Sequence, residues 1–115
     1  MDRSVKGNAF WGPPTWKTIH SFAAAYNPKH AEAFKMFMYS MIELLPCEKC
    51  RLNLAEKLGK YPIDRYLSSN HELFYWTYIL HDAVNQHNRK ISPPYDEVKA
   101  SYFDALGQEC KECRI

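Results

Sequence analysis

The sequence has little net charge, few glycines and no long apolar run, and each of these features argues against a class of function. Its formal net charge of +2, without a long basic run, argues against nucleic-acid binding. No apolar run approaches the ~20 residues that a membrane-spanning helix needs. Only four glycines are present and none belongs to a glycine-rich phosphate loop, which excludes a Rossmann-type site in its usual form.

The amino-terminal segment also lacks a secretory pattern. Residues 1–6 are not followed by an apolar segment, so we expect no signal peptide and synthesis in the cytosol. The four cysteines form two CxxC pairs, which outside a secretory setting are seldom a disulfide framework. A catalytic pair, a metal site or both fit this pattern better.

The composition predicts one folded domain. A chain of 115 residues with 46% hydrophobic and 24% charged residues can build a single modest core. Aromatic residues reach 15%, which predicts a core rich in rings, with a site for a large planar ligand as the alternative. We expect a flexible N-terminal segment at 1–10, a domain at 11–107 and a tail at 108–115.

The first CxxC pair, Cys47 and Cys50, follows an apolar run directly after Pro46. Proline suits the first turn of a helix and not its interior, so a new helix should begin here with Cys47 at its N-terminus. Unpaired N–H groups and the helix dipole would then lower the thiol pKa, and Lys49 and Arg51 add positive charge. The residues alone leave open a redox dithiol, half of a zinc site, or two buried cysteines.

Apolar spacing and helix breakers predict an all-α bundle of five helices without strands or internal repeats. The expected helices cover 15–26, 30–45, 47–58, about 70–89, and 95–106. Residues 11–15 should form a stiff entry turn, Gly59 should cap the third helix, and the prolines at 93–94 should end the fourth. The apolar faces predict a core of Trp16, Ile19, His20, Ala23, Phe34, Phe37, Met38, Met41, Leu45, Leu54, Leu58, Leu73, Trp76, Leu80, Val84, Val98, Tyr102 and Ala105.

Polar residues interrupt two of these apolar faces. His20 lies on the first helix, and His81 and Asn85 lie one turn apart on the fourth. With the three tryptophans they could line an apolar pocket for an aromatic cofactor, or they could form a core network that satisfies itself. Lys90 could contact a phosphate, or be a solvated lysine near a helix end.

The second CxxC pair, Cys110 and Cys113, lies in the charged tail. It could be a shuttle disulfide that carries electrons to Cys47 and Cys50, or it could bind zinc together with them. Zinc ribbons keep roughly 15–20 residues between their pairs. Here residues 51–109 separate the pairs, 59 residues in all, which weakens the zinc interpretation without removing it.

Three separated segments resemble those of one family. Residues 11–20 (WGPPTWKTIH), 46–50 (PCEKC) and 76–90 (WTYILHDAVNQHNRK) are similar in order and spacing to the Erv/ALR flavin-linked sulfhydryl oxidases. The resemblance covers about residues 11–106. It implies a four-helix bundle plus a short fifth helix that holds FAD, usually as a homodimer.

The resemblance also implies roles for individual residues. Cys50 would lie against the flavin as the thiolate of a charge-transfer pair, and Cys47 would be the outer cysteine that an incoming thiolate attacks. The tail pair Cys110 and Cys113 is similar to the shuttle pairs of some members. The residues expected to bind the cofactor are Gly12, Trp16, His20, Tyr26, His81, Val84, Asn85, Lys90 and Tyr102.

The chain departs from the family pattern at a few positions. Asp82 stands where the family usually has asparagine, and a carboxylate near an anionic cofactor is unfavourable unless it is paired or points away. Tyr102 stands where the family often has tryptophan. Tyr78 and Tyr95 occupy positions where many members carry a structural disulfide, so this chain should lack it. With the short length, this pattern resembles the viral members.

The sequence therefore predicts an FAD-dependent thiol oxidase that converts 2 R-SH and O2 into R-S-S-R and H2O2. Its expected partners are a thiol-containing or thioredoxin-like protein, O2 and a second copy of the chain, without nucleic acid, membrane or metal. The expected location is cytoplasmic, in a host cytoplasm or virion, in preference to an organellar intermembrane space. The alternatives are a zinc-binding helical interaction module that uses both CxxC pairs, and a flavin-free redox partner.

Overall fold

The computed structural model describes residues 3–107 and confirms the all-α prediction for them. Five α-helices and two short 3-10 helices follow one another, and no strand occurs in this part of the chain. None of the described helices is long and apolar enough to cross a membrane. The elements are α1 (Arg3–Ala24), η1 (Pro28–His30), α2 (Ala31–Leu44), α3 (Glu48–Lys60), η2 (Ile63–Tyr66), α4 (Asn70–His87) and α5 (Tyr95–Leu106).

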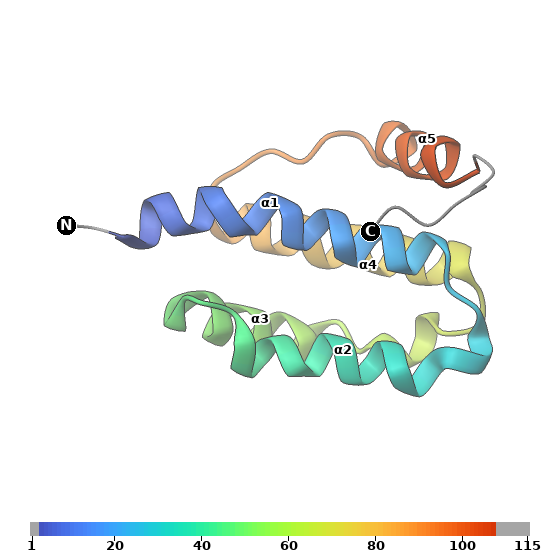
Figure 1. The fold of residues 1–115 in the computed structure, drawn as a ribbon, viewed down its shortest axis with the longest axis horizontal. Helices are drawn as coiled ribbons and strands as arrows, with labels where there is room; N and C mark the ends of the chain where they lie inside the picture. The colour runs from blue at the N-terminus through green and yellow to red at the C-terminus, as the bar shows by residue number, and fades with distance from the viewer. Residues whose placement is uncertain (1–2, 108–115) are drawn as a thin grey trace, which may run out of the picture.

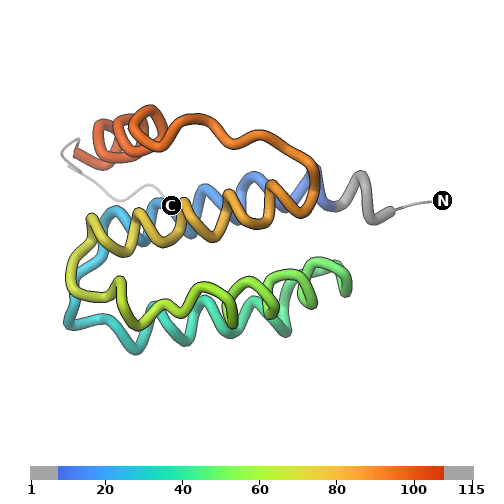
Figure 2. The backbone as a smooth tube through the Cα atoms, turned by 180° about the vertical axis from the view of Figure 1, so that it is seen from behind, coloured from blue at the N-terminus to red at the C-terminus, as the bar shows by residue number. Residues whose placement is uncertain are grey.

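The helices form two layered pairs with α5 on the outside. Helices α1 and α4 pack side by side above the pair formed by α2 and α3, and α5 lies against α1 on the opposite side (Figure 1). The view from behind shows the long connection from α4 that carries the chain back to α5 (Figure 2). This arrangement places the first half of α1, the α2–α3 turn and the end of α4 at one end of the bundle.

Helix α1 is longer than the sequence predicts. It begins at Arg3 and includes Pro13 and Pro14, so the entry turn expected at 11–15 is wrong. The two prolines are exposed on the helix surface, where their rings meet solvent, and each removes one backbone donor. Thr15 and Thr18 donate their hydroxyls to backbone carbonyls one turn earlier, at 2.7 and 3.0 Å. The division of the chain at residue 10 stays a prediction.

The α2–α3 turn confirms a helix start at the first CxxC and corrects the end of that helix. Cys47 is the N-cap of α3, and Pro46 lies before the cap, outside the first helical turn. Gly59 does not cap the helix, because α3 continues to Lys60. The C-cap is Tyr61, whose N–H donates to the carbonyl of Lys57. A glycine thus lies inside the last turn.

Helix α4 begins where predicted, but the prolines at 93–94 do not end it. The Ser69 side chain accepts the N–H of Glu72 at 3.1 Å, a regular N-cap. The helix ends at His87, before the prolines at 93–94, because Arg89 adopts a left-handed conformation with φ of 58°. The N–H of Lys90 then donates to the carbonyl of Asn85 at 2.7 Å and that of Arg89 to Gln86, a Schellman motif.

The core lies between α1, α4 and the α2–α3 pair, and the predicted apolar faces form most of it. Phe74 and Ile63 are also fully buried and were not among the predicted core residues. Ala105 is exposed, which corrects the predicted face of α5; Phe103 packs in its place. The core cluster and the partly buried residues against it include Ile19, Ala23, Phe34, Met38, Leu54, Leu58, Leu73, Trp76, Leu80, Val98 and Tyr102.

Tyrosine rings join α4 to the start of α5. The rings of Tyr78 and Tyr95 meet edge to face with centroids 5.2 Å apart, and the Tyr78 hydroxyl donates to the carbonyl of Pro93 at 2.6 Å. This contact lies at the two positions where the family resemblance placed a missing disulfide. An aromatic pair therefore holds the α4–α5 connection there.

Candidate active site

Cys47 caps helix α3 through its sulfur. The N–H of Cys50 donates to the Sγ of Cys47 at 3.3 Å, and both thiols are free and half-buried. The cap arises because Pro46 and an extended Cys47 (φ −127°, ψ 122°) separate α2 from α3 and leave the first N–H groups of α3 unpaired. The predicted position of Cys47 at a helix N-terminus is confirmed.

The two thiols differ in acidity. Burial opposes ionisation of Cys47, but hydrogen bonds from the Cys50 thiol and the N–H groups of Cys50 and Lys49, aided by the charge of Arg51, lower its pKa. Burial and the adjacent Cys47 raise the pKa of Cys50 to about 11. The reduced pair therefore ionises first at Cys47, the sulfur at the helix N-terminus.

Two residues from outside the CxxC contact this turn. The guanidinium of Arg51 donates to the carbonyl of Leu45 at 2.6 Å, which ties the first turn of α3 to the end of α2. Asn8, in the second turn of α1, accepts from the Cys50 thiol at a sulfur–oxygen distance of 3.8 Å. The charge of Arg51 lowers the pKa of Cys50 against the stronger effect of burial.

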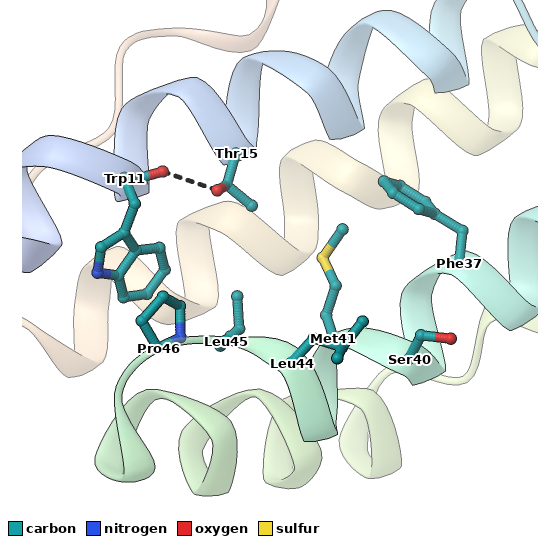
Figure 3. A pocket seen from close by; sticks show the side chains of 8 residues that line it. All are labelled: Trp11, Thr15, Phe37, Ser40, Met41, Leu44, Leu45 and Pro46. Atoms are coloured by element: carbon teal, nitrogen blue, oxygen red, sulfur yellow. Dashed lines mark hydrogen bonds between the residues drawn. The ribbon is translucent and has the colours of Figure 1, made fainter.

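An apolar pocket of about 280 Å³ opens beside this turn, between α1 and α2. Figure 3 shows Trp11 and Thr15 on α1 across from Phe37 and Met41 on α2, with Pro46 at one side of the pocket. Trp11 and Thr15 are also joined by the hydrogen bond from the threonine hydroxyl to the Trp11 carbonyl. The remaining lining residues are Ser40, Leu44 and Leu45.

On its other side, α1 carries a histidine that meets α4. His20 is buried, and its Nδ1 lies 2.9 Å from the Thr77 hydroxyl while its Nε2 lies 3.0 Å from Nδ1 of His81. Burial lowers the pKa of His20 to about 3, and His81 adds to this effect. Burial also lowers the pKa of His81 to about 4, although nearby Asp82 opposes that shift. Both rings are therefore neutral at pH 7.

Two more predicted cofactor residues join this histidine pair. The Trp16 ring stacks on His81 with centroids 4.0 Å apart and planes 5° apart. The Tyr102 ring lies tilted against His20 with centroids 5.3 Å apart. The structure thus brings α1, α4 and α5 together around one aromatic and polar cluster, made of Trp16, His20, His81 and Tyr102.

The turn of α4 after His81 carries further polar side chains that form hydrogen bonds. Asn85 donates its amide to the Ser92 hydroxyl at 3.0 Å, and that hydroxyl donates to Asp82 at 2.7 Å. The other Asp82 oxygen accepts from Gln86 at 2.8 Å. Asp82, the departure from the family pattern, is therefore paired through both oxygens.

The remaining predicted site residues are spread more widely. Val84 is half-buried, and Lys90 is exposed beyond the end of α4. Tyr26 lies apart from the cluster, because its hydroxyl donates to the carbonyl of Leu67 at 2.8 Å and its ring packs on Phe34. The tail pair Cys110 and Cys113 lies outside the described residues.

The residues present fit a planar cofactor of the expected kind. Gly12 is half-buried in α1, yet among the described residues nothing beyond its chain neighbours and the adjacent helix backbone lies within 4 Å of the position that a Cβ would take. A helical glycine costs about 1 kcal/mol relative to alanine, and packing against the described residues does not require it. A ligand that lies against this turn of α1 would account for it. The apolar pocket beside Cys47 and the hydrogen-bonding edge at His81 suit a ring system with polar attachments.

Thr77 is the site residue that sequence reasoning missed. It is fully buried on α4, one turn before His81, in contact with His20. The stripe Thr77, His81 and Asn85 repeats at i, i+4, i+8, and this spacing is the signal that could have found Thr77. Asn8 was missed as well, because residues 1–10 were expected to lie outside the helices.

The described part of the chain offers no cluster of three or more histidine, cysteine or acidic residues that could hold a metal ion. Cys47 and Cys50 would supply only two ligands of a four-coordinate zinc site. The zinc alternative therefore receives no support from residues 3–107.

Comparisons with known proteins identify similar proteins that are named for one activity. A curated relative from Acanthamoeba polyphaga mimivirus, named a probable FAD-linked sulfhydryl oxidase, is 37% identical over 92 residues, or 76% of this chain. The chain spans less than two thirds of that relative, 64% of its length. An FAD-linked sulfhydryl oxidase from a tick isolate of African swine fever virus is 31% identical over 100 residues, 84% of this chain and 82% of that protein.

A family model gives the wider assignment. The model of the Erv1 / Alr family matches residues 13–104, from the prolines of α1 to the last turn of α5. The matched range includes the CxxC turn, the histidine pair, all of α2, α3 and α4, and most of α1 and α5. A helical bundle with a cysteine-capped helix beside an apolar pocket, matched over this range, belongs to the Erv1 / Alr family.

Proposed function

We propose that this protein is an FAD-linked thiol oxidase, which forms disulfides in substrate thiols and reduces O2 to H2O2. The observation that carries the proposal is the Cys47 sulfur, which caps α3 with a lowered thiol pKa beside an apolar pocket. Membership of the Erv1 / Alr family and two viral relatives named as FAD-linked sulfhydryl oxidases support it.

Cys47 and Cys50 perform the thiol chemistry. In the resting enzyme they form a disulfide, and a substrate thiolate attacks the Sγ of Cys47, the capping sulfur. The Cys47–Cys50 bond breaks, a mixed disulfide forms, and Cys50 leaves as a thiolate with the electron pair. A second substrate thiolate then attacks the substrate sulfur of the mixed disulfide, which releases the substrate disulfide and leaves both enzyme cysteines reduced.

The chain then holds two electrons on Cys47 and Cys50. The isoalloxazine of bound FAD supplies the two-electron acceptor for this dithiol and the site at which O2 is reduced to H2O2. The charge of Arg51 favours the Cys50 thiolate, because it lowers the pKa of that thiol against the effect of burial. The adjacent pocket, whose lining includes Trp11, Met41 and Pro46, offers apolar walls next to the turn that carries the two sulfurs.

The cofactor residues are assigned from the same cluster. Trp16, His20, His81 and Tyr102 would hold FAD between α1, α4 and α5, and Gly12 leaves space for it beside α1. Asn85 and Val84 extend the edge along α4, and Lys90 offers a positive charge to the phosphates beyond the end of that helix. The role of Tyr26 in binding FAD rests on the resemblance alone.

Colour and oxygen consumption test the oxidase proposal together. The purified protein should be yellow, with the absorption near ~450 nm of an oxidised flavin. Cys50→Ser should keep the flavin and the helical circular dichroism but consume no oxygen with dithiothreitol, because the internal disulfide cannot form. A Cys50→Ser protein with full turnover would refute the mechanism. A colourless protein that binds stoichiometric zinc would instead favour the zinc module.

The tail cysteines are proposed to relay electrons from a protein substrate. Cys110 and Cys113 have the spacing of a dithiol and lie beyond α5, outside the described residues. The double variant Cys110→Ser, Cys113→Ser should slow oxidation of a reduced protein substrate several-fold and leave dithiothreitol oxidation unchanged. Equal loss with both substrates, or no loss with either, would contradict the relay.

The protein is also proposed to be a homodimer that pairs through α1 and α2. Large apolar side chains are exposed on these helices, including Phe22 at 53%, Met36 at 68% and Leu44 at 74%. A shallow apolar groove of about 350 Å³ runs between Phe22 and Phe37 at the same face. Apolar surface of this extent is typical of an interaction site. A cytoplasmic location also stays a proposal, which fractionation of expressing cells would test.

A further inference from the structure

Thr77 is a buried hydroxyl for which the oxidase mechanism above has no use. The side chain is 0% exposed, and its Oγ1 lies 2.6 Å from the carbonyl oxygen of Phe74 and 2.9 Å from Nδ1 of His20. Two oxygens at 2.6 Å need a hydrogen between them, and a carbonyl can only accept. The Thr77 hydroxyl therefore donates to Phe74, and its lone pairs face the histidine.

This direction determines the tautomer of each histidine in turn. His20 must carry its hydrogen on Nδ1 to donate to Thr77, so its Nε2 accepts. The neighbouring atom, Nδ1 of His81 at 3.0 Å, must then be the donor. Each neutral ring carries one hydrogen, and burial lowers the pKa values of both rings well below 7. Nε2 of His81 is consequently left with a lone pair.

We propose that Thr77 is a positioning residue that fixes the tautomer of His81 through His20, so that Nε2 of His81 accepts a hydrogen bond from FAD. This inference rests on the proposed function. The stack of His81 on Trp16, with planes 5° apart, fixes the direction of that lone pair. No hydrogen-bond partner for this Nε2 occurs among the described side chains and backbone groups. FAD carries donors of the required kind, namely hydroxyl groups, an adenine amino group and the flavin N3–H.

Nitrogen NMR of the histidine rings tests the relay directly in the full-length, flavin-loaded protein at neutral pH. His20 and His81 should both show a protonated, pyrrole-type Nδ1 and an unprotonated, pyridine-type Nε2. A protonated Nε2 on His81 would overturn the proposal. This measurement needs no variant and no turnover, so it decides the matter even if a substitution at Thr77 prevents folding.

Substitution at Thr77 tests the link to the cofactor. Thr77→Val keeps the shape but removes the hydroxyl, so His20 loses its acceptor and the hydrogen on His81 should move to Nε2. FAD affinity, measured by titration of the deflavinated protein, should then fall about tenfold, the scale of one hydrogen bond. Thr77→Ser should restore both the tautomers and the affinity.

Thr18→Val is the matched control. Thr18 also donates its hydroxyl to a helix carbonyl, that of Pro14 at 3.0 Å, but it is exposed and contacts no histidine. Its loss should leave the histidine signals and the FAD affinity unchanged. Wild-type tautomers or wild-type affinity in Thr77→Val would overturn the proposal, as would an equal loss in Thr77→Ser. A protein that binds no FAD would contradict the oxidase assignment, while the histidine spectrum would still decide the relay.

Discussion

The two cysteines and the two histidines of the candidate site differ in pKa because their surroundings differ. Cys47 and Cys50 share one helical turn, yet the pKa of Cys47 is lowered and that of Cys50 is raised to about 11. His20 and His81 are kept neutral by burial. Cys47, the more acidic of the two thiols, is the one that an incoming thiol is expected to attack. The two histidines stay uncharged on the other side of α1.

The stability of the protein should decrease below pH 6.5 because of the two histidines. Their pKa values are about 3 and about 4 in the folded protein against 6.5 as the ordinary value, so the unfolded chain binds more protons between these limits. The free energy of unfolding should then fall with decreasing pH by up to about 1.4 kcal/mol per pH unit for each histidine. Urea unfolding followed by circular dichroism at pH 7, 6, 5 and 4 would measure this.

Two histidine variants serve as controls for the pH dependence. His81→Gln should flatten the decrease, because it removes one of the two protonation sites. His87→Gln changes an exposed histidine at the end of α4 and should keep the wild-type slope. A wild-type stability that stays constant between pH 6.5 and 4 would contradict the burial of neutral histidines.

The helices show where local sequence patterns were sufficient to predict the ends of an element and where they were not. Apolar spacing predicted α2, α4 and α5 nearly to their ends, because each buries one continuous face. The prolines of α1 predict a helix boundary, but their exposed position on a helix packed against α4 and α5 permits the chain to stay helical. The end of α4 depends on the left-handed Arg89, which carries no signal in a single sequence.

Arg89→Gly should stabilise the protein. A left-handed conformation costs an L residue about 1 kcal/mol or more, and glycine adopts it without a clash, although glycine also loses more chain entropy on folding. We expect a net gain of about 0.5–1 kcal/mol, seen as a rise of a few degrees in Tm. Asn88→Gly is the matched control: Asn88 has φ of −91°, so glycine there should give no gain. A lower Tm for Arg89→Gly would contradict the assigned helix end.

At the scale of the whole molecule, large apolar side chains of α1 and α2 stay exposed within the described residues. The exposed apolar side chains of α1 and α2 include Phe22, Met36 and Leu44, while α4 and α5 pack against α1. A second copy of the chain would bury them symmetrically, as most homodimers do.

Phe22→Glu should convert the dimer into a monomer, because it places a charge in the middle of the apolar face. Light scattering coupled to size exclusion would measure the mass directly. Ile91→Glu is the matched control: Ile91 is 97% exposed, but it lies in the α4–α5 connection, away from that face. A stable dimer of Phe22→Glu, or a monomeric wild-type protein, would argue against pairing through α1 and α2.

Long-range contacts set the limit of what the sequence could reveal. The CxxC turn is local, so its place at a helix start followed from Pro46 alone. The pairing of His20 with His81 spans 61 positions and depends on how α1 packs against α4. The role of Thr77 follows only from that packing, because a threonine within an apolar helical face has the same local pattern whether or not it faces a histidine.

Helix α1 serves both halves of the site at once. One of its faces walls the pocket beside Cys47 and the other carries Trp16 and His20 toward α4. A helix moves as a stiff rod, so a ligand that pushes the aromatic side by a fraction of an ångström also displaces the wall next to the sulfurs. We therefore expect thiol reactivity to respond to a ligand at the histidine pair through α1 itself.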